Sequence, residues 1–438
     1  MRRIYDDHAY APSPVGSYWE AITPPGPLDP PLNGDCHADV AIIGAGYTGL
    51  SAGLHLARDH GLAPVVLDAQ EVGWGASGRN GGFNCMGGTK LSDRAYASRY
   101  GDDDLAALYR AMVDATRLVE ELSEGADIGA QSPGEWCLAH RASDAAGFRD
   151  AAAQLKRFTG LQAQVLAGDA LAEHGLGATG MHGPMFTPAG FALNPRAYVM
   201  ALARAARGAG VTIHGQTPVI GAEPGSDGRP VLTTPQGRIT ADRVILAANG
   251  YSSEDIPSAM AGRYLPVISH IIVTEPLPQD GPWRGTNMAY DSRALLHYFR
   301  RLPDGRMLFG QRGEPNDGAH RRKPMAKAAQ RDFAAMFPEW ASARIDYHWA
   351  GLVCMTAART PYVGPIPGFP GCFASLAYHG NGVSMGTWCG RQVAGLAVGR
   401  PPGGLPKGFQ GPLRPFPLPR LRRHFLRAAF QWYAWKDR

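Results

Sequence analysis

Three glycines follow an apolar run near the start of the chain. Gly44, Gly46 and Gly49 form a GxGxxG pattern between a predicted buried strand, DVAIIGAG, and a predicted helix, TGLSAGLHLARDHG. Such glycines allow a tight turn, close approach of the backbone to a pyrophosphate, and close packing of the helix on the strand. Asp68 ends the next predicted strand, where a carboxylate can accept hydrogen bonds from ribose hydroxyls. The pattern predicts a dinucleotide-binding fold, with a glycine-rich turn in another α/β protein as the alternative.

A second glycine cluster follows within AQEVGWGASGRNGGFN, between residues 73 and 82. Glycines give this segment more backbone freedom than an ordinary strand or loop needs. Such a loop can run past a pyrophosphate and beneath a flat ring, where side chains would obstruct. An enzyme that uses a nicotinamide cofactor has no evident need for it, so the stretch favours a flavin.

Several segments together resemble a known family. They are the two glycine stretches, FALNPRAYVMALARAARGAGVTI, RVILAANGY, HYFRRLPDGRMLFG, LAYHGNGV and the tail WYAWKDR. They are similar to the FAD-dependent amine and amino-acid oxidoreductases of the glycine oxidase and D-amino-acid oxidase class, and most similar to the γ-glutamylputrescine oxidoreductase-like branch. The resemblance covers nearly the whole chain. It implies FAD as the cofactor and an α/β fold (α+β overall), in which a Rossmann-type FAD-binding domain carries an inserted, mainly antiparallel-sheet substrate domain.

The resemblance also implies a set of cofactor-binding residues. The second glycine stretch would line the flavin ring and ribityl chain, Val219 would contact adenine through the backbone, and the segment around Asn381 would lead into a helix facing flavin N1 and O2. Relatives commonly show Ser and His where this chain has His379 and Asn381. The full set is Gly44, Gly46, Gly49, Asp68, Gly75, Ser77, Arg79, Asn80, Gly81, Val219, Asn249, Gly250, Gly380, Asn381, Gly382 and Val383.

The implied reaction is hydride transfer from a carbon bearing an amine to flavin N5, followed by hydrolysis of the imine. The resemblance favours a γ-glutamylputrescine-like amine; sarcosine, glycine or a D-amino acid, with an oxidase or a dehydrogenase, are alternatives. Alternation in LLHYFRR puts Tyr298 and Arg300 on one strand face, where an arginine can pair with a carboxylate. His270 is a further candidate for the substrate pocket. A surface strand with solvated arginines is the alternative.

Two further residues bear on how the flavin is held and reoxidised. Cys354 lies in a CMT context similar to that of the cysteine bonded to the flavin in sarcosine oxidase-like members, which makes a covalent link possible although the closer branch generally lacks this cysteine. Those members also use a lysine in the strand corresponding to RMLFG, where this chain has Leu308. Oxygen or another electron acceptor therefore both stay open.

Composition limits the remaining possibilities. The 438 residues are 45% hydrophobic and 18% charged, enough for a large soluble body. No run is apolar enough to span a bilayer and MRRIYDDHAY lacks a secretory signal core, so a cytoplasmic location is expected. Six cysteines without a CxxC pair give no sign of a metal site. The positive charge concentrates in residues 399–438, so no nucleic-acid partner is expected for the body.

The predicted organisation has four parts. Residues 1–35 form an extended N-terminal arm; 36–95, 181–255 and 345–398 form the discontinuous FAD-binding domain; 96–180 and 256–344 form the substrate domain; and 399–438 form a basic capping segment. The tail is expected to pack on the body rather than on a membrane. Two other functions remain as alternatives: a nicotinamide-dependent Rossmann dehydrogenase and a noncatalytic protein that binds a membrane or partner through its tail.

Overall fold

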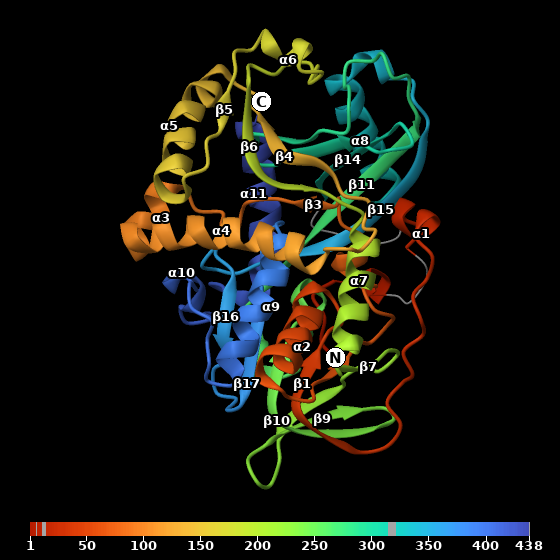
Figure 1. The fold of residues 1–438 in the computed structure, drawn as a ribbon, viewed down its shortest axis with the longest axis vertical. Helices are drawn as coiled ribbons and strands as arrows, with labels where there is room; N and C mark the ends of the chain where they lie inside the picture. Colours follow the sequence, from red (N-terminus) through yellow and green to blue (C-terminus); the bar gives the residue numbers. More distant parts are fainter. Residues whose placement is uncertain (6, 11–14, 314–320, 438) are drawn as a thin grey trace.

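The computed structural model describes residues 1–5, 7–10, 15–313 and 321–437, and its strands form two sheets. The first sheet lies in the lower half of Figure 1 and the second in the upper half, with the long helix α4 crossing between them. Two sheets, the first with a parallel core and the second mainly antiparallel, confirm the fold class expected from the sequence.

The first sheet is built on five parallel strands in the order β17, β10, β1, β2 and β7. The apolar run at residues 40–43 packs between helices on one face and a second apolar cluster on the other, which is why it reads as a continuous hydrophobic stretch. Its strands are β1 (Cys36–Ile43), β2 (Val65–Leu67), β7 (Thr212–His214), β8 (Gly221–Pro224), β9 (Pro230–Thr234), β10 (Gly237–Leu246), β16 (Tyr362–Pro365) and β17 (Cys372–Leu376).

The second sheet runs in the order β15, β11, β14, β13, β12, β4, β6 and β3, with β5 added to β6. A hairpin turn across Asp304 and Gly305 joins β13 to β14 in antiparallel pairing, and Gly305 takes the positive φ that the turn requires. The strands are β3 (Phe83–Asn84), β4 (Gln131–Leu138), β5 (Gln164–Val165), β6 (Pro184–Ala192), β11 (Leu265–Pro276), β12 (Met288–Asp291), β13 (His297–Arg301), β14 (Arg306–Arg312) and β15 (Ile345–Met355).

The expected domain boundaries need correction at three strands. β3, β6 and β15 fall within the segments assigned to the FAD-binding domain, yet all three belong to the second sheet. The segment that begins at residue 345 contains the apolar run of β15, which pairs antiparallel with β11 over its whole length. An apolar run reports burial on both faces and carries no information about strand direction, so the boundary at residue 345 could not be read from it.

The helices cover the sheets and join them. The predicted helix after the first glycine turn is α2, which ends at Gly61 in the left-handed conformation, and residues 101–125 contain the longer helix α4. The helices are α1 (Tyr18–Ile22), α2 (Tyr47–His60), α3 (Asp93–Tyr100), α4 (Asp102–Leu122), α5 (Ala142–Thr159), α6 (Ala170–Glu173), α7 (Pro195–Gly208), α8 (Arg322–Met336), α9 (Ser384–Ala397), α10 (Lys407–Gln410) and α11 (Arg422–Lys436).

The N-terminal segment is not only an extended arm. Ser17 and Glu20 form a capping box at the start of α1, and this short helix buries Tyr18 and Trp19. The Trp19 indole N–H donates a hydrogen bond to the carbonyl oxygen of Asn80 at 2.8 Å. The arm therefore supports the second glycine stretch, because a buried aromatic anchor fixes its backbone.

The C-terminal helix α11 packs on β11 with one face. Leu426 joins a small apolar cluster with Leu265 and Val267, and the Arg422 guanidinium pairs with the Glu254 carboxylate. Phe425, Trp432 and Trp435 lie on the exposed part of the helix. Within the described ranges, none of the helices is both long and apolar enough to cross a lipid bilayer.

Candidate active site

A cavity of about 460 Å³ takes its lining from both sheets and from the loops between them. Both glycine stretches and the loop before α9 line it, although they are far apart in the sequence. Of the sixteen cofactor-binding residues expected from the sequence, Gly49 and Gly250 lie outside the lining and the others contribute to it. The topology thus brings the separated glycine segments to one place.

The first glycine stretch forms the turn between β1 and α2. Gly44 has φ +113°, and a Cβ atom there would lie 2.9 Å from the carbonyl oxygen of Ala247. A Cβ atom at Gly49 would lie 1.8 Å from the Gly44 carbonyl oxygen, so Gly49 serves helix packing behind the cavity. Helix α2 begins after Gly46 without a side-chain cap, which leaves a helix N-terminus facing the cavity.

Asp68 fixes the geometry beside this turn. Its carboxylate accepts hydrogen bonds from the backbone N–H groups of Ala45 at 2.7 Å and Gln70 at 2.9 Å. Burial raises its pKa above the usual value, and the two backbone donors oppose that effect. Asp68 lines the cavity next to the first glycine turn. A carboxylate that accepts hydrogen bonds from the ribose of a dinucleotide has to lie at this position.

The second glycine stretch is held by its own polar side chains. Arg79 packs over the Trp74 ring and donates to the carbonyl oxygen of Gly75 at 3.1 Å. The Asn80 amide donates to the Ala76 and Ser77 carbonyl oxygens, both at 3.1 Å. A Cβ atom at Gly81 would lie 2.8 Å from the Tyr298 ring, so this loop passes directly against the second sheet.

The third segment is the loop before α9. Ala377, His379 and Gly380 have positive φ angles, and the Asn249 side chain holds the loop by accepting a hydrogen bond from the Ala377 N–H at 2.8 Å. Asn381 donates to the Met86 carbonyl oxygen at 3.1 Å, which joins this loop to the chain after the second glycine stretch. Burial lowers the pKa of His379 to about 3, so the imidazole is neutral.

The glycine cradle fits a dinucleotide cofactor. A Cβ atom at Gly46 would lie 2.8 Å from the Ser77 hydroxyl, and this hydroxyl accepts the Tyr47 N–H at 3.0 Å. Helix α9 also starts at the cavity, at Val383, without a side-chain cap. Two helix N-termini and the half-buried acid Asp68 suit the pyrophosphate, the flavin O2 region and the ribose of FAD.

One face of the second sheet forms the opposite wall. Tyr298 lines the cavity, and its hydroxyl lies 3.1 Å from that of Ser269. Arg312 on β14 lies opposite Ser269 on β11 in the register of the sheet. Its side chain is half-buried and also lines the cavity. Lys90 also lines the cavity, and its side chain is exposed. Desolvation of the ammonium group lowers the pKa of Lys90 to about 8.

Arg300 and His270 do not reach the cavity. Arg300 shares a strand face with Tyr298, but its guanidinium lies over the rings of Trp19 and Phe83 and donates to the Leu193 carbonyl oxygen at 2.6 Å. His270 lies on the opposite face, because its neighbours Ser269 and Ile271 are the cavity-lining residues. Its Nδ1 atom is 3.3 Å from Nε2 of His348.

Of the two residues expected to bear on how the flavin is held and reoxidised, only Cys354 reaches the cavity. Cys354 lines the cavity, 1% exposed, and burial raises the pKa of its thiol to about 12. Leu308 is fully buried and is not among the residues that line the cavity.

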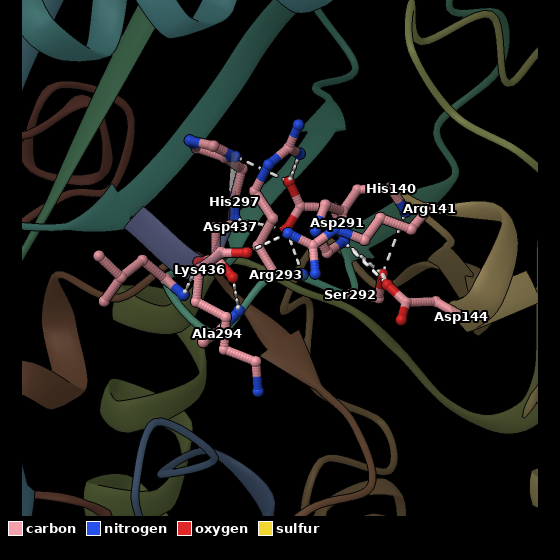
Figure 2. A network of polar contacts seen from close by, with 11 residues as sticks. His140, Arg141, Asp144, Asp291, Ser292, Arg293, Ala294, His297, Lys436 and Asp437 are labelled. Carbon is pink, nitrogen blue, oxygen red and sulfur yellow. Dashed lines mark hydrogen bonds and ion pairs between the residues drawn. The ribbon is translucent and has the colours of Figure 1, made fainter. Parts of the chain in front are cut away.

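A polar network holds the loop between β12 and β13, which carries Leu296 and leads to Tyr298. The fully buried Asp291 accepts a hydrogen bond from His297 Nδ1 at 2.7 Å, and Asp437 accepts from the N–H groups of Ala294 and Leu295 at 3.0 and 2.8 Å. Figure 2 shows Asp291 beside His297 and Asp437 beside Ala294. Leu296 lines the cavity. The end of the chain therefore helps to position the cavity wall.

Sequence reasoning missed three titratable residues in this wall: Arg312, Lys90 as a lining residue, and Glu135 on β4. Strand alternation could have indicated that Arg312 faces the cavity, because Arg312 lies two residues beyond Gly310, the residue of β14 that pairs with Tyr298. Glu135 had none, because the register of β4 shifts on both sides of Pro133 and Gly134 has a positive φ, which breaks simple alternation there.

Comparisons with known proteins agree with this architecture. Residues 39–396 match the family described as DAO, FAD dependent oxidoreductase. A Rhizobium meliloti protein named "Probable oxidoreductase OrdL" is 32% identical over 97% of this chain and 98% of its own length, and the γ-glutamylputrescine oxidoreductase of Escherichia coli is 28% identical over 84% of this chain and 85% of its own. The crystal structure of glycine oxidase from Geobacillus kaustophilus shares the fold, with a TM-score of 0.70, 20% identity, and coverage of 85% of this chain and 98% of that one.

The family match covers most of the chain, from β1 to the end of α9. It confirms FAD in place of the nicotinamide alternative and an enzyme in place of a noncatalytic binding protein. The chain belongs to the DAO family of FAD-dependent oxidoreductases.

Proposed function

We propose that this enzyme oxidises the C–N bond of an amine or amino acid that carries a carboxylate, with a γ-glutamylated amine of the γ-glutamylputrescine kind as the favoured substrate. The observation that carries the proposal is that two basic residues, Arg312 and Lys90, both line the cavity. Similarity to a γ-glutamylputrescine oxidoreductase supports the same substrate class.

Arg312 would bind the substrate carboxylate. Its planar guanidinium can pair with both carboxylate oxygens. Burial lowers its pKa. One N–H of the group donates to the carbonyl oxygen of His379 at 3.4 Å, which limits its orientation. The Tyr298 hydroxyl, held by Ser269, offers a further hydrogen bond at the same wall.

The charges around the cavity also favour the reactive form of the substrate. Bound FAD supplies a hydride acceptor at N5, and the carbon that loses the hydride must carry an uncharged amine. Positive charge on Arg312 and Lys90 disfavours an ammonium ion nearby, so it lowers the pKa of the bound amine. The substrate loses a hydride and a proton to give an imine, and water then releases an aldehyde or keto acid with ammonia or an amine.

Anaerobic reduction of the bound flavin tests the proposal. The purified holoenzyme is mixed with γ-glutamylputrescine, putrescine, sarcosine, glycine and D-alanine, and the visible flavin absorbance is followed. We expect fast bleaching with γ-glutamylputrescine and much slower bleaching with putrescine, which lacks the carboxylate. Equal rates with these two amines would contradict a carboxylate site at Arg312.

A further inference from the structure

The C-terminal helix α11 has an exposed apolar stripe on a different side from the one that packs on β11. Its buried side carries Leu426, which is 7% exposed. The apolar stripe consists of Leu421, just before the helix, at 45% exposed, Phe425 at 50%, Trp432 at 59% and Trp435 at 64%. Spacings of four, seven and three residues place these side chains along one side of a helix.

Exposed large apolar side chains gather in this segment. Outside residues 418–435, those of the described chain are Met1, Ile22, Leu28 and Ile220, which lie at separate places along the sequence. Apolar residues that are exposed singly are usual on a protein surface, whereas a continuous stripe that includes two tryptophans marks an interaction site.

Both ends of α11 are fixed to the body of the protein. At its start, the Arg422 guanidinium pairs with the Glu254 carboxylate. At its end, the Asp437 carboxylate accepts the N–H groups of Ala294 and Leu295 at 3.0 and 2.8 Å. The apolar stripe is therefore held outward on a helix that is already formed, so a partner that binds it does not have to order the segment first.

The charges beside the apolar stripe are positive. Arg420, Arg427 and Lys436 are exposed, and the sequence has no Asp or Glu between residues 418 and 436. A complementary partner must therefore offer negative charge next to apolar material. The surface of an anionic lipid bilayer has both, and tryptophan side chains favour the level of the lipid headgroups.

A second copy of the chain fits these charges poorly. Two copies of α11 that paired in antiparallel fashion through the apolar stripe would cross near its midpoint, Ala428. The Arg427 side chains of both copies would then lie close together, and neither helix offers an acid between residues 418 and 436 to pair with them.

We propose that the apolar stripe of α11 binds the surface of an anionic lipid bilayer, with the helix lying in the plane of the headgroups and the rest of the enzyme outside the membrane. The expected packing of the tail on the body applies to the side that carries Leu426, and the proposal concerns the other side. The inference goes beyond the proposed function and does not depend on which amine is oxidised.

Sedimentation with lipid vesicles tests this proposal on the holoenzyme. One set of vesicles is phosphatidylcholine alone, and the other contains equal amounts of phosphatidylcholine and phosphatidylglycerol. We expect roughly 100-fold tighter binding to the anionic vesicles, because each exposed basic residue near such a surface contributes about fivefold. Absence of binding to the anionic vesicles, or equal binding to both sets, overturns the proposal.

The two stripe tryptophans also give a direct signal. Apart from Trp74, which lines the cavity, the other tryptophans are at most 8% exposed. Phosphatidylcholine brominated on its acyl chains should therefore quench the fluorescence of Trp432 and Trp435 when the anionic vesicles contain it. Quenching that is unchanged in Trp432→Ala/Trp435→Ala contradicts contact through this stripe.

Paired variants separate the contributions of apolar area and charge. Trp432→Ala/Trp435→Ala should weaken binding to the anionic vesicles at least roughly tenfold, and Arg420→Gln/Arg427→Gln roughly 30-fold. The matched controls are Leu28→Ala/Ile220→Ala, two exposed apolar residues elsewhere, and Arg149→Gln/Arg204→Gln, two exposed arginines on α5 and α7. Both controls should bind as the unaltered enzyme does.

Other measurements keep the outcomes distinct. Flavin content and circular dichroism check that each variant folds, and reduction of the flavin by the amine should be the same in all of them. Sedimentation velocity without lipid reports on the rival occupant. A dimer that dissociates in Trp432→Ala/Trp435→Ala would show that a second copy covers the stripe, and it would overturn the proposal.

Discussion

The Arg312 guanidinium donates a hydrogen bond to the carbonyl oxygen of His379, with 3.4 Å between Nη2 and the oxygen. Arg312 ends β14 in the second sheet, and His379 lies in the loop that leads to α9 on the first. This contact joins the second sheet to the loop before α9. In our proposal the substrate carboxylate binds Arg312 and the loop faces the flavin, so the contact would tie the position of the cation to that of the flavin.

Replacing Arg312 should weaken the recognition of carboxylated substrates. In Arg312→Ala we expect kcat/KM for γ-glutamylputrescine to fall roughly 100-fold, since charged hydrogen bonds contribute about 1.5–3 kcal/mol each. The fall with putrescine should be less than about threefold, because that amine has no carboxylate. Steady-state kinetics with both amines measure the difference, and an equal loss with both would contradict the role of Arg312.

Adding a methyl group to the first glycine turn should weaken FAD binding. Gly46→Ala places a Cβ atom 2.8 Å from the Ser77 hydroxyl, so the cradle must shift. We expect the FAD dissociation constant to rise roughly tenfold, the effect of about 1–2 kcal/mol of overpacking. Gly208→Ala, where the structure has open space, is the matched control. Unchanged flavin content in Gly46→Ala would argue against the cradle.

The flavin should not be bonded to Cys354. A thiol adds to the flavin as a thiolate, and burial raises the pKa of this thiol to about 12. We therefore expect acid precipitation to release all the flavin into the supernatant. Yellow colour that stays with the precipitate in the unaltered protein and disappears in Cys354→Ala would show a covalent link.

The Asp291–His297 pair should make stability fall at alkaline pH. Burial alone would lower the pKa of His297, but its hydrogen bond to Asp291 and the Asp332 carboxylate 3.9 Å from its Nε2 outweigh burial and raise that pKa from 6.5 to about 9. Since the folded pKa is the higher one, the stabilisation is complete below pH 6.5 and is lost as pH rises through about 9.

Urea unfolding at pH 6 and pH 10 measures this effect. The free energy of unfolding should fall by on the order of 2 kcal/mol more in the unaltered protein than in His297→Gln. His182→Gln, an exposed histidine, serves as the control and should behave as the unaltered protein does. The same pH dependence in all three proteins would contradict the assignment to His297.

The cofactor half of the cavity could largely be predicted from sequence because its signals are local. The turn at Gly44 and Gly46, the helix that follows and the acid at Asp68 all lie within one βαβ unit, where spacing alone reports position. The second stretch was recognisable because glycines in such number have few other uses. Tyr298 was also assigned to the cavity, since strand alternation had placed it on the inner face.

The substrate half could be predicted only in part, because it depends on register between distant strands. His270 faces away from the cavity, since a shift of one position along a strand reverses the face. Arg300 is on the inner face as alternation indicates, but Trp19 from the N-terminal segment and Phe83 cover it. No local pattern in LLHYFRR reveals that a helix some 280 residues earlier in the chain closes this part of the wall.

Anaerobic titration of the bound flavin with γ-glutamylputrescine tests the central claim most directly. If the cavity holds FAD between the glycine loops and presents the amine to it, one equivalent of this amine removes the visible absorbance of one equivalent of flavin. A flavin that stays oxidised with γ-glutamylputrescine and every other amine or amino acid in the panel, or that only NADH reduces, would contradict the account.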